Sequence, residues 1–372
     1  MSEHTPRPGE YIERELKSRG WTQRDLADVL GRTLAAVNEI IRSKRGLTTE
    51  TAVALGQAFG TGPEIWLQRE ADYRLSLAEQ PDNAIPLRAR CYDFAPVKEM
   101  EKRQWIRATK TPDELEEELK HFFHVASLDH EPELGVALRA SVDGTLTPSQ
   151  RAWCFRVRQL AEVVAVAEYQ EDRLGACIRE LRQRAAYPQE AHKVSEVLAT
   201  YGIRLVVVEP LAGTKVDGVA LWLDSKSPVI GVSIRYDRVD GFWFTLCHEL
   251  AHIAHRHQAP VDVDLPEQIL MPTTVRPEIE RQADDDASSM LVPKAELESF
   301  ILRVSPLYSK EKIIRFANRI KIHPGIIVGQ LQHRGEIGYR ANREMLVRIR
   351  DYVTSVALTD GWGLSIDPEV FK

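Results

Sequence analysis

The chain has 372 residues, of which 43% are hydrophobic and 28% charged, with a formal net charge of −6. This composition is that of a soluble globular protein, and the length predicts two or three domains. No run of about 18 apolar residues is present, which excludes an ordinary transmembrane helix, and the acidic balance excludes a basic surface over the whole protein. Any nucleic-acid surface must therefore be local.

Cysteine usage and the N-terminal segment predict the compartment. The four cysteines lie far apart without a CxxC pair. Such spacing favours reduced thiols over a disulfide framework or a cysteine-rich zinc site. The opening MSEHTPRPGEYIEREL has no apolar stretch of the kind found in signal peptides, so we expect a cytoplasmic protein without a membrane partner.

Residues 1–80 have the pattern of short helices joined by tight turns. GEYIERELKSRG ends at Gly20, and WTQRDLADVLG begins with Thr22 as a helix cap. LAAVNEIIRSKRG follows, and TTETAVALGQAFG should be capped by Thr49 and ended by Gly60. We predict a small all-α domain.

The segment WTQRDLADVLGRTLAAVNEIIRSKRG has the proportions of a helix-turn-helix. Ala27 and Gly31 are expected where its two helices pack closely, and the second helix should enter the major groove of double-stranded operator DNA. The residues expected to face bases are Thr33, Leu34, Ala35, Ala36 and Asn38. Those expected at phosphates are Gln23, Arg42, Lys44 and Arg45. The alternative is a helical module that binds protein.

Basic charge is concentrated on this motif. Residues 14–45 contain eight basic and four acidic side chains. The excess is modest, which favours weak binding by one copy and a homodimer on DNA. The segments RPGEYIERELKSRGWTQRDLADVLG and SKRGLTTETAVALGQAFGTGPEIWLQREADY resemble the HigA-type antitoxin subgroup of Xre repressors over residues 7–75. The resemblance implies an operator, a dimer and a cognate toxin as possible partners.

The middle of the chain contains no motif that indicates catalysis or ligand binding. Residues 78–96 contain three prolines and little periodicity, which predicts a joint. Residues 95–188 predict a helical connector that spaces or dimerises the two ends, with helices in TPDELEEELKHFF, TPSQRAWCFRVRQLAEVVAVAEYQ and DRLGACIRELRQR. The acidic DELEEEL run is interpreted as a solvated helix face.

After Pro188 the pattern changes. AHKVSEVLATYG predicts a helix that ends at Gly202, and IRLVVVEP, VDGVALWLD and SPVIGVSI predict the strands of a small antiparallel sheet. FWFTLCHELAHIAHRH and PEIERQADDDASSMLVP predict helices. Between them, residues 258–277 form a proline-broken stretch that predicts a loop. The tail from SKEKIIRFANRI onward is mostly helical in pattern.

The stretch HELAH carries the strongest chemical signal. His248 and His252 are four residues apart, so on a helix both imidazoles point to one side and can hold one metal ion. Glu249 lies about 100° round the helix, which suits a base acting on water rather than a ligand. The alternative for this pentapeptide alone is an amphipathic helix with solvated histidines.

A hydrolytic zinc site needs a third protein ligand and an open position. A third histidine ten residues after His248 would fall on Gln258, so that arrangement fails. Glu280 and Asp284 form an ExxxD pair on one face of a second helix. We predict that Glu280 binds the metal and that Asp284 accepts the free N–H of a ligand histidine. The alternative is a solvated acidic patch.

Two residues close to the predicted ligands have other predicted roles. His255 follows His248 by seven residues and could hydrogen-bond beside the ligands or assist a transition state, although such a residue more often simply packs. Cys247 is predicted to be buried and inert. The ligand set of two histidines and a glutamate favours Zn²⁺, with Mn²⁺ or another divalent metal as alternatives.

Residues 195–335 resemble the ImmA/IrrE family of metallopeptidases through YGIRLVVV, FTLCHELAHIAH and ERQADDDASSMLVP. That family has a zincin-like fold, and its motifs are HELGH and E-x-[EQ]-A-[ND]-x-F-A-x-x-L-L-x-P. The residues on its metal and catalytic positions are His248, Glu249, His252 and Glu280. Ala251 replaces a glycine, and Asp286 replaces the usual aromatic residue. The resemblance implies a narrow specificity, commonly for a repressor protein.

We therefore expect an α+β, mostly helical chain: an all-α helix-turn-helix domain over 1–80, a helical connector over 95–188, and a zincin-like metallopeptidase domain with a small sheet and C-terminal helices over 189–372. The predicted function is a DNA-binding regulator with a zinc-dependent endopeptidase that cleaves a regulatory protein. The alternative is an antitoxin and autorepressor that binds a toxin and operator DNA. In that case the metal-binding domain is not catalytic.

Overall fold

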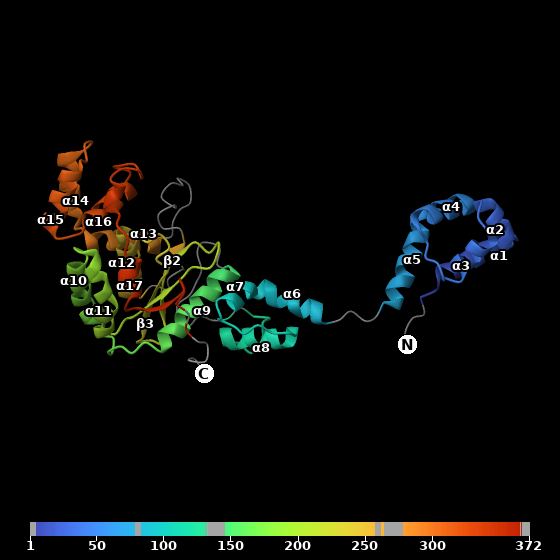
Figure 1. Cartoon of the computed structure of the whole chain (residues 1–372), viewed down its shortest axis with the longest axis horizontal. Helices are drawn as coiled ribbons and strands as arrows, with labels where there is room; N and C mark the ends of the chain where they lie inside the picture. The colour runs from blue at the N-terminus through green and yellow to red at the C-terminus, as the bar shows by residue number, and fades with distance from the viewer. Residues whose placement is uncertain are drawn as a thin grey trace. The chain divides into compact units, whose positions relative to one another are not determined.

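The computed structural model of the chain describes residues 5–78, 83–130, 132, 146–256, 262–263, 278–364 and 366. Two compact units, Met1–Asn83 and Ala84–Lys372, divide the chain (Figure 1). Across the described residues, no helix combines the length and the apolar character that a membrane span requires.

The first unit is all helical, as the sequence predicts. Its helices are α1 (Pro8–Arg19), α2 (Gln23–Leu30), α3 (Leu34–Ile41), α4 (Thr49–Phe59) and α5 (Pro63–Leu77). Ile12, Leu26, Val37, Leu55 and Trp66 are among the buried side chains of its core. Each helix contributes one apolar stripe to this core, which is why short helices of modest propensity are stable here.

Most of the predicted helix ends are confirmed. The Thr22 hydroxyl accepts a hydrogen bond from the backbone N–H of Asp25, and Gly20 and Gly60 end their helices in the left-handed region. Two expectations were wrong. Thr48, not Thr49, caps α4. Gly31 does not mark close packing: a Cβ there would meet open space, and its φ of 60° shows that it ends α2.

The second unit combines helices with a sheet. Before the sheet come α6 (Ala84–Phe94), α7 (Val97–Lys102), α8 (Pro112–Phe123), α9 (Pro148–Glu162), η1 (Glu171–Arg173), α10 (Leu174–Arg184), η2 (Pro188–Lys193) and α11 (Val194–Thr200). The strands are β1 (Arg204–Val208), β2 (Val216–Trp222), β3 (Pro228–Val232), β4 (Asp262–Val263) and β5 (Leu358–Asp360). The remaining helices are α12 (Val239–Ala254), α13 (Glu278–Leu291), α14 (Lys294–Val304), α15 (Lys310–Ile320), α16 (Pro324–His333), η4 (Arg343–Met345) and α17 (Arg350–Thr354).

The sheet is mixed rather than antiparallel. In the described residues its strand order is β4-β2-β3-β1-β5, with β1 parallel to both β3 and β5 and β2 antiparallel to β3 and β4. The continuous apolar run of RLVVV is typical of a strand buried on both faces, and such strands favour parallel pairing under helices. The three predicted strands are confirmed, whereas β5, supplied by the C-terminal tail, was not foreseen.

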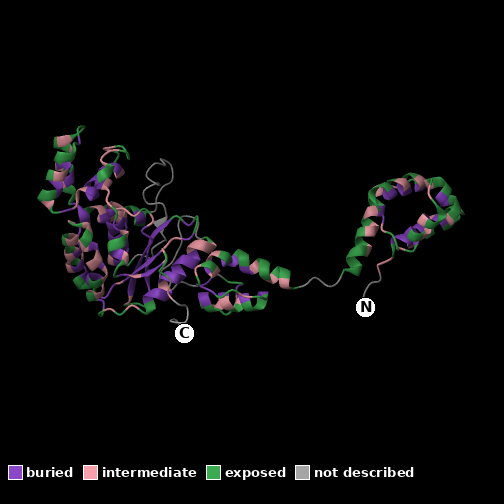
Figure 2. Cartoon of the chain, in the orientation of Figure 1, coloured by how far each residue is buried: buried purple, intermediate pink, exposed green. Residues whose placement is uncertain are grey.

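Helices cover both faces of this sheet, so β2 and β3 are buried along their whole length (Figure 2). Helix α9 packs on β1, β2 and β3 from one side, and α11 and α12 pack from the other. The segment predicted as a spacer is thus part of this core. Residues 151–161 of α9 are buried almost all round its axis, which is the character of a core helix rather than a solvated connector.

A buried ion pair ties the tail to α9. The Arg156 guanidinium donates to the Asp360 carboxylate in β5, and the Trp105 indole N–H donates to the same carboxylate at 2.9 Å. Burial lowers the pKa of Arg156, and the negative charge of Asp360 opposes that shift. Because a charge left alone in the interior is costly, this pair fixes β5 against the face that α9 covers.

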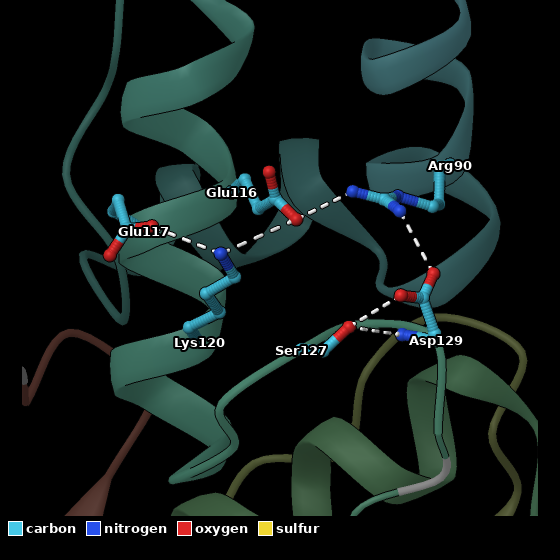
Figure 3. A network of polar contacts seen from close by, with 6 residues as sticks. All are labelled: Arg90, Glu116, Glu117, Lys120, Ser127 and Asp129. Atoms are coloured by element: carbon cyan, nitrogen blue, oxygen red, sulfur yellow. Dashed lines mark hydrogen bonds and ion pairs between the residues drawn. The ribbon is translucent and has the colours of Figure 1, made fainter.

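The predicted joint at residues 78–96 contains a helix. Helix α6 occupies most of it, because Pro86 is the third helical residue and the N–H of a first-turn residue needs no partner within the helix. Helix α6 packs on α8 through a network of polar contacts that Figure 3 shows. Arg90 contacts Glu116 at 2.6 Å and Asp129 at 2.9 Å. The acidic face of α8 is therefore partly paired.

The predicted loop at residues 258–277 lies outside the described residues except for Asp262 and Val263. These two form β4, whose partners in β2 are Gly218 and Val216. The pairing shifts register between those two positions of β2, which is a β-bulge at the start of the strand.

Candidate metal centre and nucleic-acid interface

Helix α12 carries the predicted metal motif. It contains no helix-breaking residue after Gly241, and its buried residues run from Val239 to Ile253. His248, Glu249 and His252 are all fully buried. Histidines and a carboxylate buried in this way are uncommon unless they are paired or hold a cation, so the helix already points to a site rather than to a solvated surface.

Three side chains converge between α12 and α13. His248 Nε2 lies 2.9 Å from His252 Nε2 and 3.3 Å from Glu280 Oε2, and His252 Nε2 lies 3.6 Å from Glu280 Oε1. Within the described part of the chain, these residues form a group able to hold one ion. Ligands of a tetrahedral zinc ion lie roughly 3.3–3.6 Å apart, as bond lengths of about 2.0–2.2 Å require. The spacing therefore fits a metal.

A second carboxylate of α13 stands behind the first histidine. Asp284 Oδ1 lies 3.0 Å from His248 Nδ1, on the side of the ring away from Glu280. A carboxylate there favours the proton on Nδ1 and leaves the lone pair of Nε2 for a metal. Asp284 is therefore within reach of His248, and its role there stays a prediction.

Glu249 lies against the backbone of the sheet. A Cβ built on Gly218 of β2 would stand only 2.4 Å from Glu249 Oε1 and 2.7 Å from Thr245 Cγ2. Both carboxylate oxygens of Glu249 are buried. Glycine at position 218 is thus what lets the carboxylate approach the strand, a relation invisible in the sequence because the two residues are 31 positions apart.

Two further residues of the predicted site, His255 and Cys247, lie near the end of α12 and inside it. His255 ends α12 and lies 2.6 Å from the Asp286 carboxylate, at a part of the surface that both side chains leave partly exposed. The polar Asp286 therefore stands at the surface rather than in the packing of α13. Cys247 is buried, and burial raises its pKa to about 12, as expected of an inert thiol.

The residues predicted to face DNA gather at the start of α3. Thr33, Leu34 and Ala35 are exposed, and Ala36 and Asn38 are partly so. The Thr33 hydroxyl accepts from Ala36 N, and the Asn38 amide donates to Gln23 Oε1 at 3.1 Å, which links α2 to α3. Arg42, Lys44 and Arg45 are exposed beyond the end of α3. Both groups are therefore at least partly exposed to solvent, as contact with DNA would require.

Comparison with known proteins agrees with this arrangement. A family model described as helix-turn-helix matches residues 12–66, and a peptidase family model described as IrrE N-terminal-like domain matches residues 200–329. The chain therefore joins a helix-turn-helix domain in its first unit to an IrrE-like peptidase domain in its second unit. The predicted fusion of these two families is confirmed, and so is the mostly helical α+β fold.

Three relatives each match about a fifth to a quarter of this chain. Virulence-associated protein I of Dichelobacter nodosus is 38% identical over 79 residues, which are 21% of this chain and 73% of that protein. Virulence-associated protein A' of the same organism is 40% identical over 72 residues, 19% of this chain and 63% of that protein. The uncharacterized HTH-type transcriptional regulator YddM of Escherichia coli strain K12 is 28% identical over 88 residues, 24% of this chain and 93% of that protein.

In the IrrE-like domain, Gly218 provides a test of how Glu249 is placed. Gly218→Ala should lower peptide cleavage by about 10-fold or more, because the new methyl group displaces a carboxylate whose position matters at the scale of 1 Å. Metal content should stay unchanged, since the three atoms nearest to the new methyl group belong to Glu249 and Thr245 and not to the predicted ligands. Gly338→Ala, at an exposed position of the same unit where a Cβ meets open space and φ is not positive, is the control for adding a methyl group. Cleavage at the wild-type rate in Gly218→Ala would show that Glu249 does not depend on this contact.

Proposed function

We propose that this protein is a transcriptional regulator whose IrrE-like domain is a zinc-dependent endopeptidase of narrow specificity, acting on a regulatory protein. The observation that carries the proposal is the convergence of His248, His252 and Glu280, with Glu249 buried beside them. Two histidines, a glutamate and an adjacent acid are a hydrolytic set. A purely structural site would not need the additional buried acid.

The reaction follows from the positions of these side chains. A zinc ion held by His248, His252 and Glu280 would supply a Lewis acid that polarises the peptide carbonyl and acidifies water. Glu249 would take a proton from the attacking water and deliver it to the leaving amine. Asp284 keeps the His248 ring in one orientation. We place the substrate in an extended conformation along the edge of the sheet, where backbone groups can pair with it.

The N-terminal unit supplies the DNA-binding half of the proposal. We infer that a homodimer binds an operator, with the start of α3 in the major groove and Arg42, Lys44 and Arg45 on phosphates. Replacing all three by Ala should weaken binding to every DNA sequence alike and flatten the dependence of log K on log salt by up to about 3. A gel shift at two salt concentrations measures this. The control is a variant of the second unit that loses the same charge, with Ala in place of Lys98, Lys226 and Arg340. An equal loss of DNA affinity in both variants would contradict the assignment.

The whole proposal is tested by mixing the purified full chain with proteins encoded near it and with itself. New termini inside a regulatory protein, found by mass spectrometry and abolished by a chelator, are expected. A stable complex with a small toxin and no cleavage of any partner would instead support the antitoxin function, with a metal domain that only senses or stabilises.

A further inference from the structure

A cavity of about 440 Å³ lies beside the metal centre. Gly241, Phe244 and Thr245 of α12 form one wall, and α13, α16 and the segment that joins β3 to α12 form the others. Phe242, Leu291, Ile326, Val232 and Ile234 contribute apolar surface. Neither the metal ligands nor the reaction described above accounts for a space of this size next to a packed helix.

The cavity and the metal ligands share one face of α12. Gly241, Thr245, His248 and His252 follow each other at spacings of three or four residues, so they line a single stripe. Thr245, which lines the cavity, precedes His248 by three residues of helix, a rise of about 4.5 Å. An extended peptide advances about 3.3 Å per residue. A side chain one or two residues from the bond that is cut can therefore enter the cavity.

Aromatic rings connect the cavity with the metal centre. The Phe244 ring centroid lies 6.1 Å from that of His248 and 5.8 Å from that of His333, and both Phe244 and His333 line the cavity. Phe244 thus stands between a metal ligand and the cavity wall. A group that fills the cavity contacts the same ring that packs on His248, which couples its binding to the geometry of the metal centre.

The charges of the lining neutralise each other. Arg235 contacts Asp217 at 3.1 Å, and Arg238 contacts Asp240 at 2.6 Å. Asp237 accepts backbone N–H groups of Ile349 and Arg350. Arg334 is the third arginine of the lining, so three arginines stand against three aspartates and these residues leave no net charge, which makes apolar walls and size the source of selectivity.

We propose that this cavity is the specificity pocket of the peptidase domain and that it takes a large apolar side chain, such as that of phenylalanine, next to the cleaved bond. The inference rests on the proposed peptidase function, because it assigns the pocket to the substrate of that same site. It predicts that sequence around the cut, rather than exposure alone, limits which regulatory proteins are cleaved.

Gly241 offers a way to fill the pocket without touching the metal centre. A Cβ at this position meets no atom within 4 Å, and the residue is helical, so substitution needs no backbone change. Gly241→Phe should occupy the cavity with its own ring. Gly241→Ala adds a methyl group and leaves the cavity open, and it serves as the matched control. Gly241→Leu is the smaller filling variant to use if Gly241→Phe melts early.

Two succinyl hydroxamates, one with a benzyl and one with a methyl side chain, separate the pocket from the metal centre. Both carry the same chelating group, and their affinity for the zinc-loaded full chain is measured by calorimetry without any cleavage. We expect the benzyl compound to bind wild type and Gly241→Ala about 10–100-fold more tightly than the methyl compound. In Gly241→Phe or Gly241→Leu this preference should largely disappear, while the methyl compound binds as before.

Each other outcome has a definite meaning. Equal affinity of the two compounds for wild type, or a benzyl preference that survives in the filled variants, overturns the pocket and leaves the metal centre intact. Failure of both compounds to bind zinc-loaded wild type contradicts the metal centre itself, and the pocket assignment falls with it.

Discussion

Glu249→Gln should abolish nearly all peptide cleavage while the protein keeps its metal. The substitution preserves the shape of a fully buried side chain that lies against Gly218, and it leaves His248, His252 and Glu280 unchanged. It removes the oxygen that accepts a proton from water. Loss of a general base typically lowers the rate by about 10²–10⁴-fold.

This prediction is checked by three measurements on one variant. Cleavage of an identified substrate should fall to about 1% or less of the wild-type rate, whereas metal content, melting temperature and operator binding should match wild type. Glu298→Gln, the same chemical change at an exposed position of α14, controls for the substitution. A variant that cuts at the wild-type rate would exclude Glu249 as the base, and loss of metal would instead make it a ligand.

Glu280→Ala should leave the protein largely without metal. Glu280 is buried and is the only carboxylate among the three converging ligand residues of the described chain. Removal of partners outside the ligand shell weakens metal binding by about 10–100-fold. Loss of a ligand should cost at least that much, and cleavage should be lost together with the ion.

Asp286→Ala is the matched control for Glu280→Ala. Asp286 lies on the same helix, but its carboxylate contacts His255 at the surface. Elemental analysis after exhaustive dialysis should find close to one metal per chain in Asp286→Ala and far less in Glu280→Ala. The opposite order would show that α13 presents another acid to the ion.

The candidate metal set could be read from the sequence because it depends on local geometry. The spacing of His248 and His252 fixes their common face on any helix, and ExxxD does the same for Glu280 and Asp284. Helix periodicity does not tell how two helices meet. The packing of α12 on α13 that brings Glu280 to the histidines was therefore a hypothesis until the structure placed the atoms.

The sequence-based predictions were wrong where contacts between distant segments determine the structure. Strand segments were recognisable from β-branched residues and turns, but the parallel pairing of β1 with β3 and β5 depends on helices that cover both faces. Likewise, α9 has helical character in the sequence, yet only burial of Arg156 against Asp360 shows that it belongs to the core. Gly218 and the cavity at Gly241 are products of tertiary contact and have no local signal.

The most direct test of the account is a zinc titration of chelator-treated, full-length wild type, with cleavage of a regulatory protein followed at each step. We predict that cleavage is absent without metal, rises in proportion to added zinc, and stops rising at one equivalent per chain, as one centre built from His248, His252 and Glu280 requires. Cleavage that persists in the fully metal-free protein, or no cleavage of any candidate at one bound zinc per chain, would contradict it.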